Sequence, residues 1–240
     1  MKKKLFVSAM SLVMAIVLMT STSFAWFTVS TAPEVSDIDV TMTATKNLEI
    51  AKASTNMTTA PSEVAVGDAG DETKWGAKIS SFTATVDFPA INDSGIKTIS
   101  YDASGRVNSA YVAATAPTAL IDGVGYYTAD IKAGDTTVKS AAKVAAVFGV
   151  WLRSNVACTG TTNAVTVNTT GSDTKWDIVL ADASGTPLAN NKVELAANTA
   201  KFVQVIVFVK GNEVKAANVA TDLKIENVKL EFSSSAVSGS

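Results

Sequence analysis

The residue types that usually carry acid–base or nucleophilic chemistry are scarce in this chain. Its 240 residues include no histidine and a single cysteine. Histidine is the usual base of serine and cysteine nucleophiles and a common zinc ligand, so those chemistries have no candidate here. Ser140 and Lys143 match the S-x-x-K spacing of serine acyl-transferases. The S-D-N and K-T-G elements of that motif are missing, since only Ser172-Asp173-Thr174 comes near the first, so we interpret the match as chance.

Carboxylates are the remaining catalytic candidates, because two of them suffice to hydrolyse a glycoside. The densest cluster is Asp68 with Asp71 and Glu72, in an irregular stretch that spans residues 51–76. The EF-hand spacing is absent, and a flexible oxygen-rich loop offers at best a weak calcium site. We therefore treat the three residues as weak calcium candidates, and we expect no cofactor, no other metal site and no enzymatic activity.

Tryptophan side chains raise one further chemistry, because exposed indole rings can stack on sugars. Trp151 lies inside an apolar run and is expected in the core. Trp75 and Trp176 each follow a lysine and are expected to be partly exposed, which keeps sugar binding as an alternative. Cys158 is expected to be buried and inert, because a lone cysteine forms no internal disulfide and free cysteines are among the most buried residues.

The elements that must hold these residues are strands. Apolar and polar residues alternate over residues 37–45 and 81–88, which is typical of strands with one face on a core. Residues 144–152 and 202–209 are apolar at nearly every position and predict central strands covered on both faces. The predicted core residues of the first pair of segments are Ile38, Val40, Met42, Ala44, Phe82, Ala84, Val86 and Phe88, and shorter strands are expected at 164–167, 176–180 and 228–232.

Helices and turns complete this expectation. Residues 139–146 have a composition that suits a helix, but their continuation into an apolar run favours a strand, and a short helix is expected at 216–223. Turn signals such as Asp122-Gly123 and Ser184-Gly185 separate the strands and supply residues that tolerate positive φ. The density of strands and turns predicts an all-β, two-sheet β-sandwich, with residues 51–76 as a surface excursion.

The N-terminus has the three parts of a secretory signal. Lys2 to Lys4 form a basic region, and residues 5–19 form an uninterrupted, mostly apolar run. Small residues at Ser23 and Ala25 predict cleavage between Ala25 and Trp26. A retained anchor is the alternative, but the run is shorter than the ~20 residues that span a bilayer. We therefore expect a secreted protein that meets the membrane only as a precursor.

Removal of this signal peptide, residues 1–25, leaves a mildly acidic chain. It takes away three lysines and no acidic residue, so the net charge changes from −2 to −5. The remaining lysines are scattered singly and form no basic stretch, which argues against a nucleic-acid partner. We divide the mature chain into an N-terminal strand segment (26–34), one sandwich domain (35–232) and a disordered tail (233–240).

The cleavage region carries a family resemblance. The block Ser23-Phe24-Ala25-Trp26-Phe27-Thr28 resembles that of the TasA and camelysin family of Gram-positive biofilm matrix fibre proteins, which a dedicated signal peptidase, SipW, cuts. Residues 35–40 are similar to the first strand of these proteins. Residues 207–213, Asn218 and the strand at 228–232 resemble their ending, with Lys210 where relatives have an acid.

This resemblance implies a jelly-roll sandwich, export through a SipW-like signal peptidase, and assembly into biofilm matrix fibres. Some members are described as metallopeptidases, but a chain without histidine gives no reason to carry that activity over. Our leading hypothesis is therefore a self-assembling extracellular fibre subunit whose main partner is itself. The alternatives are a monomeric surface adhesin or carbohydrate-binding module, and a hydrolase that uses carboxylates.

The segment that cleavage exposes, residues 26–32, is a candidate for joining subunits. Apolar and polar side chains alternate along it, and Pro33 stops it from running straight into the next strand. Such a strand can complete the sheet of a neighbour or pack on its own domain, and its reach of roughly 23 Å at ~3.3 Å per residue can cross a sheet. The predicted assembly residues are Trp26, Phe27, Thr28, Val29 and Ser30.

Overall fold

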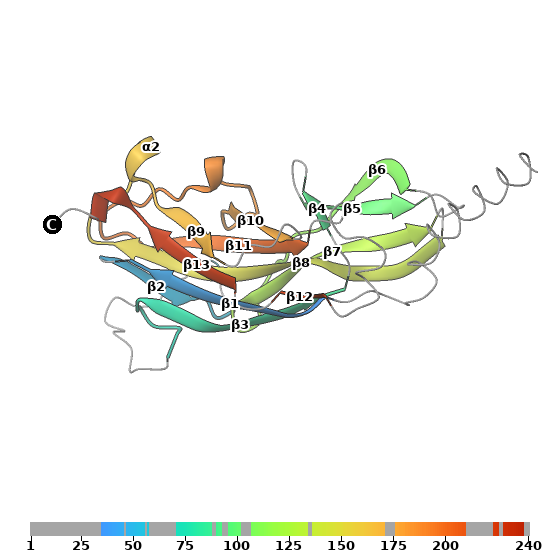
Figure 1. Ribbon diagram of the computed structural model, residues 1–240, viewed down its shortest axis with the longest axis horizontal. Coiled ribbons are helices and arrows are strands. Elements are labelled where there is room, and N and C mark those ends of the chain that lie inside the picture. Colours follow the sequence, from blue (N-terminus) through green and yellow to red (C-terminus); the bar gives the residue numbers. More distant parts are fainter. Residues whose placement is uncertain are drawn as a thin grey trace, which may run out of the picture.

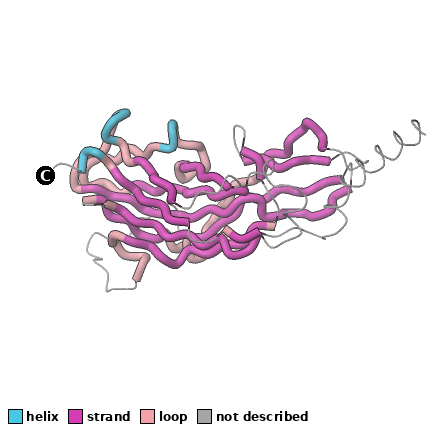
Figure 2. Tube along the Cα trace, in the orientation of Figure 1, coloured by secondary structure: helices cyan, strands magenta, loops and turns pink. Residues whose placement is uncertain are grey.

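The computed structural model describes residues 35–45, 47–55, 57, 71–87, 90–92, 96–101, 107–133, 136–170, 176–209, 223–225 and 228–237. Strands dominate this part of the chain, and its few helical turns gather at one end of the molecule (Figures 1 and 2). The predicted signal peptide, the segment 26–34, Asp68 and residues 216–222 of the predicted helix lie outside the described residues.

The smaller of two sheets is built around the first strand. Its members in the described part are β1 (Val35–Ala44), β3 (Lys78–Val86), β9 (Thr166–Thr170), β12 (Leu223–Lys224) and β13 (Val228–Ser233). β1 pairs antiparallel with β3 along one side and parallel with β12 and β13 along the other. β9 pairs antiparallel with β13 and forms one edge of this sheet.

The larger sheet is organised by one strand of 19 residues, β8 (Thr136–Ser154). β8 pairs with β7 (Val124–Ala133), β11 (Lys201–Val209) and β2 (Leu48–Lys52), and β10 (Trp176–Ala181) adds to β11 as an edge. The remaining strands are β4 (Ala90–Asn92), β5 (Ile96–Tyr101) and β6 (Val107–Ala113), and the short helical turns are α2 (Gly160–Asn163), η1 (Ala189–Asn191) and η2 (Ser235–Val237).

The main core lies between the two sheets. Ile38, Val40 and Met42 of β1 are fully buried there, and alternate residues of β8 and β11 reach it from the larger sheet. The rings of Phe82 and Phe148 meet across the core with centroids 5.0 Å apart. Burial of this apolar surface is the main driving force for the fold. The two-sheet β-sandwich expected from the sequence is therefore present.

The opposite face of the larger sheet is buried as well. Trp151, Phe202 and Phe208 form a second apolar cluster on this side, with the rings of Trp151 and Phe202 5.3 Å apart. Leu120, which is 1% exposed, lies over Gly149 so closely that a Cβ at that glycine would overlap its side chain. Apolar residues on both faces explain why β8 and β11 lack the alternation of the other strands.

Both faces of β11 are buried, as its continuous apolar run predicts. Val203, Val205, Val207 and Val209 belong to the inter-sheet core, and Phe202, Ile206 and Phe208 belong to the outer cluster. The strands predicted at 37–45, 81–88, 144–152, 176–180 and 228–232 are confirmed as β1, β3, part of β8, β10 and β13, although β3 ends at Val86 and Phe88 lies outside the described residues. Residues 139–146 are strand, as favoured.

Three expectations need correction. The strand predicted at 164–167 begins at Thr166 and continues to Thr170, because Val165 pairs instead with Val193. The stretch 51–76 is not wholly irregular, since residues 51–52 belong to β2 and Gly76 bridges Ile50. The tail predicted to be disordered from Ser233 is ordered up to Val237: Ser233 ends β13, and the Ser234 hydroxyl donates to the carbonyl of Asn163 at 2.5 Å.

The turn predicted at Asp122-Gly123 is a two-residue hairpin turn. Both residues have positive φ, 48° and 76°, and Ile121 and Val124 exchange two main-chain hydrogen bonds of 2.8 and 3.0 Å. Positive φ at both central positions is the signature of a type I′ turn, for which Asp-Gly is a preferred pair. Residues 121–124 therefore fix the start of β7.

Candidate functional site: the edges of the sandwich

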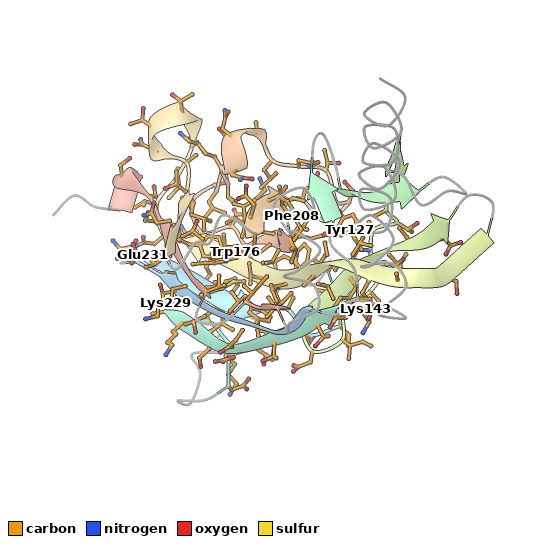
Figure 3. All side chains as sticks on the ribbon, turned by 45° about the vertical axis from the view of Figure 1, so that its right-hand side comes forward. Tyr127, Lys143, Trp176, Phe208, Lys229 and Glu231 are labelled. Carbon is orange, nitrogen blue, oxygen red and sulfur yellow. The ribbon has the colours of Figure 1, made fainter. Side chains whose placement is uncertain are left out.

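Ser140 and Lys143 do not form an acyl-transferase site. They lie in β8, so the helix that would place them on one face is absent. Ala141 between them has φ of 47° at a bulge in the pairing of β7 with β8, and its N–H donates to the Asp130 carboxylate at 2.8 Å. The Lys143 ammonium lies 4.3 Å from the ring centroid of Tyr126 (Figure 3 labels Lys143). These contacts are structural, which supports the interpretation of the motif as chance.

The two described carboxylates of the calcium candidate set are engaged within the protein. Asp71 accepts hydrogen bonds from the hydroxyl (2.6 Å) and N–H (3.1 Å) of Thr73, and these bonds hold the pKa of its carboxyl below the usual value. Glu72 accepts from the N–H (2.6 Å) and hydroxyl (2.8 Å) of Ser80 in β3. Asp71 therefore holds the loop 71–76 together internally, whereas Glu72 fastens the loop to the outer edge of β3 and occupies part of that edge.

The tryptophans do not form a sugar-stacking platform. Trp75 and Trp176 were expected to be partly exposed, but they are only 3% and 5% exposed. They lie on opposite faces of the larger sheet, Trp75 in the outer cluster and Trp176 in the inter-sheet core (Figure 3 labels Trp176). Trp151 is buried as predicted. The Arg153 guanidinium covers the Trp75 ring at 4.3 Å, so that indole face is already occupied.

Cys158 is fully buried, as predicted. Its main chain pairs with Leu195 through two hydrogen bonds of 2.8 and 3.0 Å. The side chain belongs to the inter-sheet core. A thiol in this position acts as a small apolar group rather than as a nucleophile.

The outer edge of β10 is closed by the chain that follows it. The Asn191 side chain accepts from the N–H of Leu180 at 3.0 Å and donates to the carbonyl of Ile178 at 3.3 Å, as a peptide group of a neighbouring strand would. The N–H of Leu188 donates to the carbonyl of Leu180 at 2.8 Å. Asn191 has φ of 52°, a value that asparagine tolerates better than most residues. This edge is therefore unable to accept a further strand along residues 178–180.

The loop that continues from β10 is held by one carboxylate. Asp182 accepts from the Ser184 hydroxyl at 2.6 Å and from the N–H groups of Ser184 and Thr186 at 2.9 and 3.0 Å. These bonds, the hydroxyl first, hold the pKa of Asp182 below its usual value. Burial, followed by the charge of Asp182, raises the pKa of Tyr127, whose hydroxyl donates to the carbonyl of Gly185 at 3.5 Å.

The outer edge of β9 is open by comparison. Beyond the Val165–Val193 bridge, β9 pairs only with β13 among the residues that the structure describes. Thr169 lies opposite Leu230 and so faces the core side of the sheet, yet it is exposed. Val167, opposite Phe232, is only partly buried. The core is thus incompletely covered beside β9, where one more strand would extend both the ladder and the apolar face.

The predicted assembly residues are not among those described. Ala25, Trp26 and the segment up to Ser30 lie outside the described ranges, as does Asp68. Sequence reasoning missed both edges as features, although two signals were present. Asn190-Asn191 is a pair that tolerates positive φ, and residues 166–170 (TVNTT) contain no proline or charge, the usual means of blocking an edge.

Comparisons with protein-family models, with curated proteins and with solved structures find no match for this chain. Within the described ranges, no helix is long and apolar enough to cross a membrane. The same ranges contain no group of three or more Asp, Glu, His or Cys side chains that could hold a metal ion. The edges of the sandwich are therefore the features on which a functional argument can be built.

Proposed function

We propose that the chain is the precursor of an exported structural protein that assembles into extracellular fibres. In this proposal the segment 26–32 of one mature subunit adds as a strand to the β9 edge of the next. The single observation that carries it is the open edge of β9, beside which the core-facing Thr169 is exposed. An extended segment that adds there gains main-chain hydrogen bonds for affinity and places alternate side chains against the core for specificity.

The alternation of the N-terminal segment suits this edge. A strand that pairs with β9 directs every second side chain toward the inter-sheet core, beside Val167 and Thr169. Phe27 and Val29 supply apolar groups for that side, whereas Thr28 and Ser30 would face water. The contact joins two different surfaces, so it does not close into a dimer and propagates as a fibre. Before cleavage the signal peptide occupies the N-terminus of this segment, which ties assembly to export.

Electron microscopy of the secreted protein tests the proposal. The unchanged chain should form filaments without added ligand. The double substitution Phe27→Ser and Val29→Ser removes the anchoring side chains at constant length and should leave a folded monomer. The matched control, Thr28→Ala with Ser30→Ala, changes the opposite face of the same segment and should keep the filaments. Filaments from the Phe27→Ser, Val29→Ser protein, or their loss in the control, would contradict the proposed mechanism.

A further inference from the structure

The outer face of the smaller sheet is a polar surface on four adjacent strands. Along β1 and β13, buried residues such as Met42 and Leu230 alternate with exposed or partly exposed ones that point away from the core. The outward residues are Lys78 and Thr83 on β3, Asp39, Thr41 and Thr43 on β1, Lys229 and Glu231 on β13, and Asn168 and Thr170 on β9. We call this set the polar face.

The register arranges the polar face in rows across the strands. Thr43 lies between Lys78 and Glu231, and Glu231 lies opposite Asn168. In the next row Thr41 lies opposite Lys229, which lies opposite Thr170. Glu231 and Lys229 therefore lie on the same strand in successive rows, and they carry opposite charges (both are labelled in Figure 3). Their neighbours on either side are uncharged.

The charges of the polar face form no ion pair with other described residues. None of Asp39, Lys78, Lys229 and Glu231 takes part in an ion pair in the described part of the chain, where Lys52, Lys74 and Arg153 do. A sandwich with one solvated face per sheet is common, so polarity alone says nothing about a partner. The informative feature is the order of the signs along β13.

The order of charges along β13 is self-complementary about one particular two-fold axis. That axis lies in the plane between two facing copies, perpendicular to the strands and midway between these two rows. When two copies meet face to face about that axis, Lys229 of one copy lies opposite Glu231 of the other, and the same pair forms again by symmetry. Thr41 meets Thr43, and Asn168 meets Thr170. No pair of like charges is brought together along β13 or β1, because Asp39 lies opposite Thr45.

We propose that the polar face is a lateral contact between two copies of this chain, with Lys229 opposite Glu231 of the second copy. The contact is isologous, so it is separate from the head-to-tail addition of strands proposed above and does not depend on it. Four strands about 4.8 Å apart and two to three rows about 6.8 Å apart cover roughly 260–390 Å² per copy. A stable interface buries about 800 Å² per partner, so this contact is weak between single subunits and accumulates where many copies are aligned.

Charge reversal tests the proposal in the full mature chain. If the unchanged chain polymerises, the charge variants are made in the Phe27→Ser, Val29→Ser protein. If it does not, they are made in the unchanged chain. Sedimentation equilibrium at low salt, up to about 1 mM protein, measures self-association. Lys229→Glu and Glu231→Lys each create two like-charge contacts per pair and should weaken association about tenfold or more. The exchange of both residues in one chain should restore it to within about threefold.

An equimolar mixture of the two single variants gives the sharpest result. Each variant alone repels itself, whereas the mixture brings opposite signs together at both contacts and should associate at least as tightly as the parent. The matched control is Lys192→Glu, the same charge change in the loop after η1, which should leave association unchanged. If the parent does not self-associate, if the single variants behave like the parent, or if the mixture stays monomeric, the proposed contact is wrong, whether or not fibres form.

Discussion

The edge strands β9 and β10 follow each other in the sequence and belong to different sheets, yet they end their sheets in opposite ways. Asn191 and Leu188 close β10 by satisfying the main chain of residues 178–180. β9 carries Thr and Asn along its open edge and has neither proline nor charge to obstruct pairing. An edge is usually protected because it invites aggregation. The difference suggests that one edge is shielded and the other is left able to accept a strand.

The largest contrast should appear in the apolar side chains beside each edge. Phe208 lies on β11, next to β10, and is 2% exposed in the outer cluster. Replacement by alanine should cost about 3–5 kcal/mol in the free energy of unfolding, because it removes a large buried ring and leaves a cavity. Denaturant melts at constant pH measure this value.

The comparison for Phe208→Ala is Val167→Ala in β9. Val167 is only partly buried at the open edge, so its truncation should cost about 1 kcal/mol or less. A loss below about 1 kcal/mol for Phe208→Ala would show that the outer cluster adds little to stability. Equal losses for the two variants would show that β9 is as well covered as β11.

The second contrast concerns the cap on β10. Asn191→Gly removes the side chain that bonds Leu180 and Ile178 while it keeps the positive φ of residue 191. We expect a loss of about 0.5–1.5 kcal/mol in the free energy of unfolding and faster hydrogen exchange at the Leu180 amide. If residues 178–180 become able to pair with another strand, the variant should also aggregate more readily.

Asn190→Gly is the matched control for the cap. Asn190 is exposed and has φ of 55°, but its side chain does not bond β10. Its replacement should leave both the stability and the exchange of the Leu180 amide nearly unchanged. A similar effect at the two asparagines would mean that the turn, and not the side-chain cap, maintains the closed edge.

The third contrast is a pH effect at the closed edge of β10. The folded-state pKa of Asp182 lies below its usual value, so its carboxylate contributes stability above the usual pKa of about 4, and that contribution is lost as the pH falls through the folded-state pKa. The unfolding free energy of the parent should therefore decline below about pH 4. Asp182→Asn should be less stable near neutral pH and should decline less steeply, and parallel curves would contradict this role.

The sequence predicted the strands more completely than their edges. Alternation identified β1 and β3, and the continuous apolar runs identified β8 and β11, because the burial of one face or two is encoded in which positions are apolar. It missed β2, β4, β5, β6, β7 and the two-residue β12. In β7, Gly125 lies beneath Leu120 and Pro117, and Thr128 pairs with Thr115, so this strand is covered by a segment that no local pattern reveals.

The candidate sites show the same limit. The prediction that Trp75 and Trp176 are partly exposed was wrong because it relied on the polar residues that flank each one in the sequence. Burial depends instead on the face of the sheet against which each ring packs. The closed edge depends on Asn191 reaching β10 across 11 to 13 residues of sequence. The open edge depends on register, since only the pairing of Thr169 with Leu230 reveals that an exposed threonine faces the core.

The smallest expected effect on stability comes from Thr169→Lys at the open edge. Thr169 is exposed, and a lysine there can extend into water, so the free energy of unfolding should change by no more than about 0.5 kcal/mol. An incoming strand would have to bury this charge beside the core, so filament formation should be lost. Thr159→Lys is the control: Thr159 is exposed before α2 and makes no side-chain cap bond, so filaments should persist. If Thr169→Lys also leaves the filaments unchanged, strand addition occurs at another edge. The edge of β9 is then simply a solvated edge, whose threonines hydrogen-bond to water.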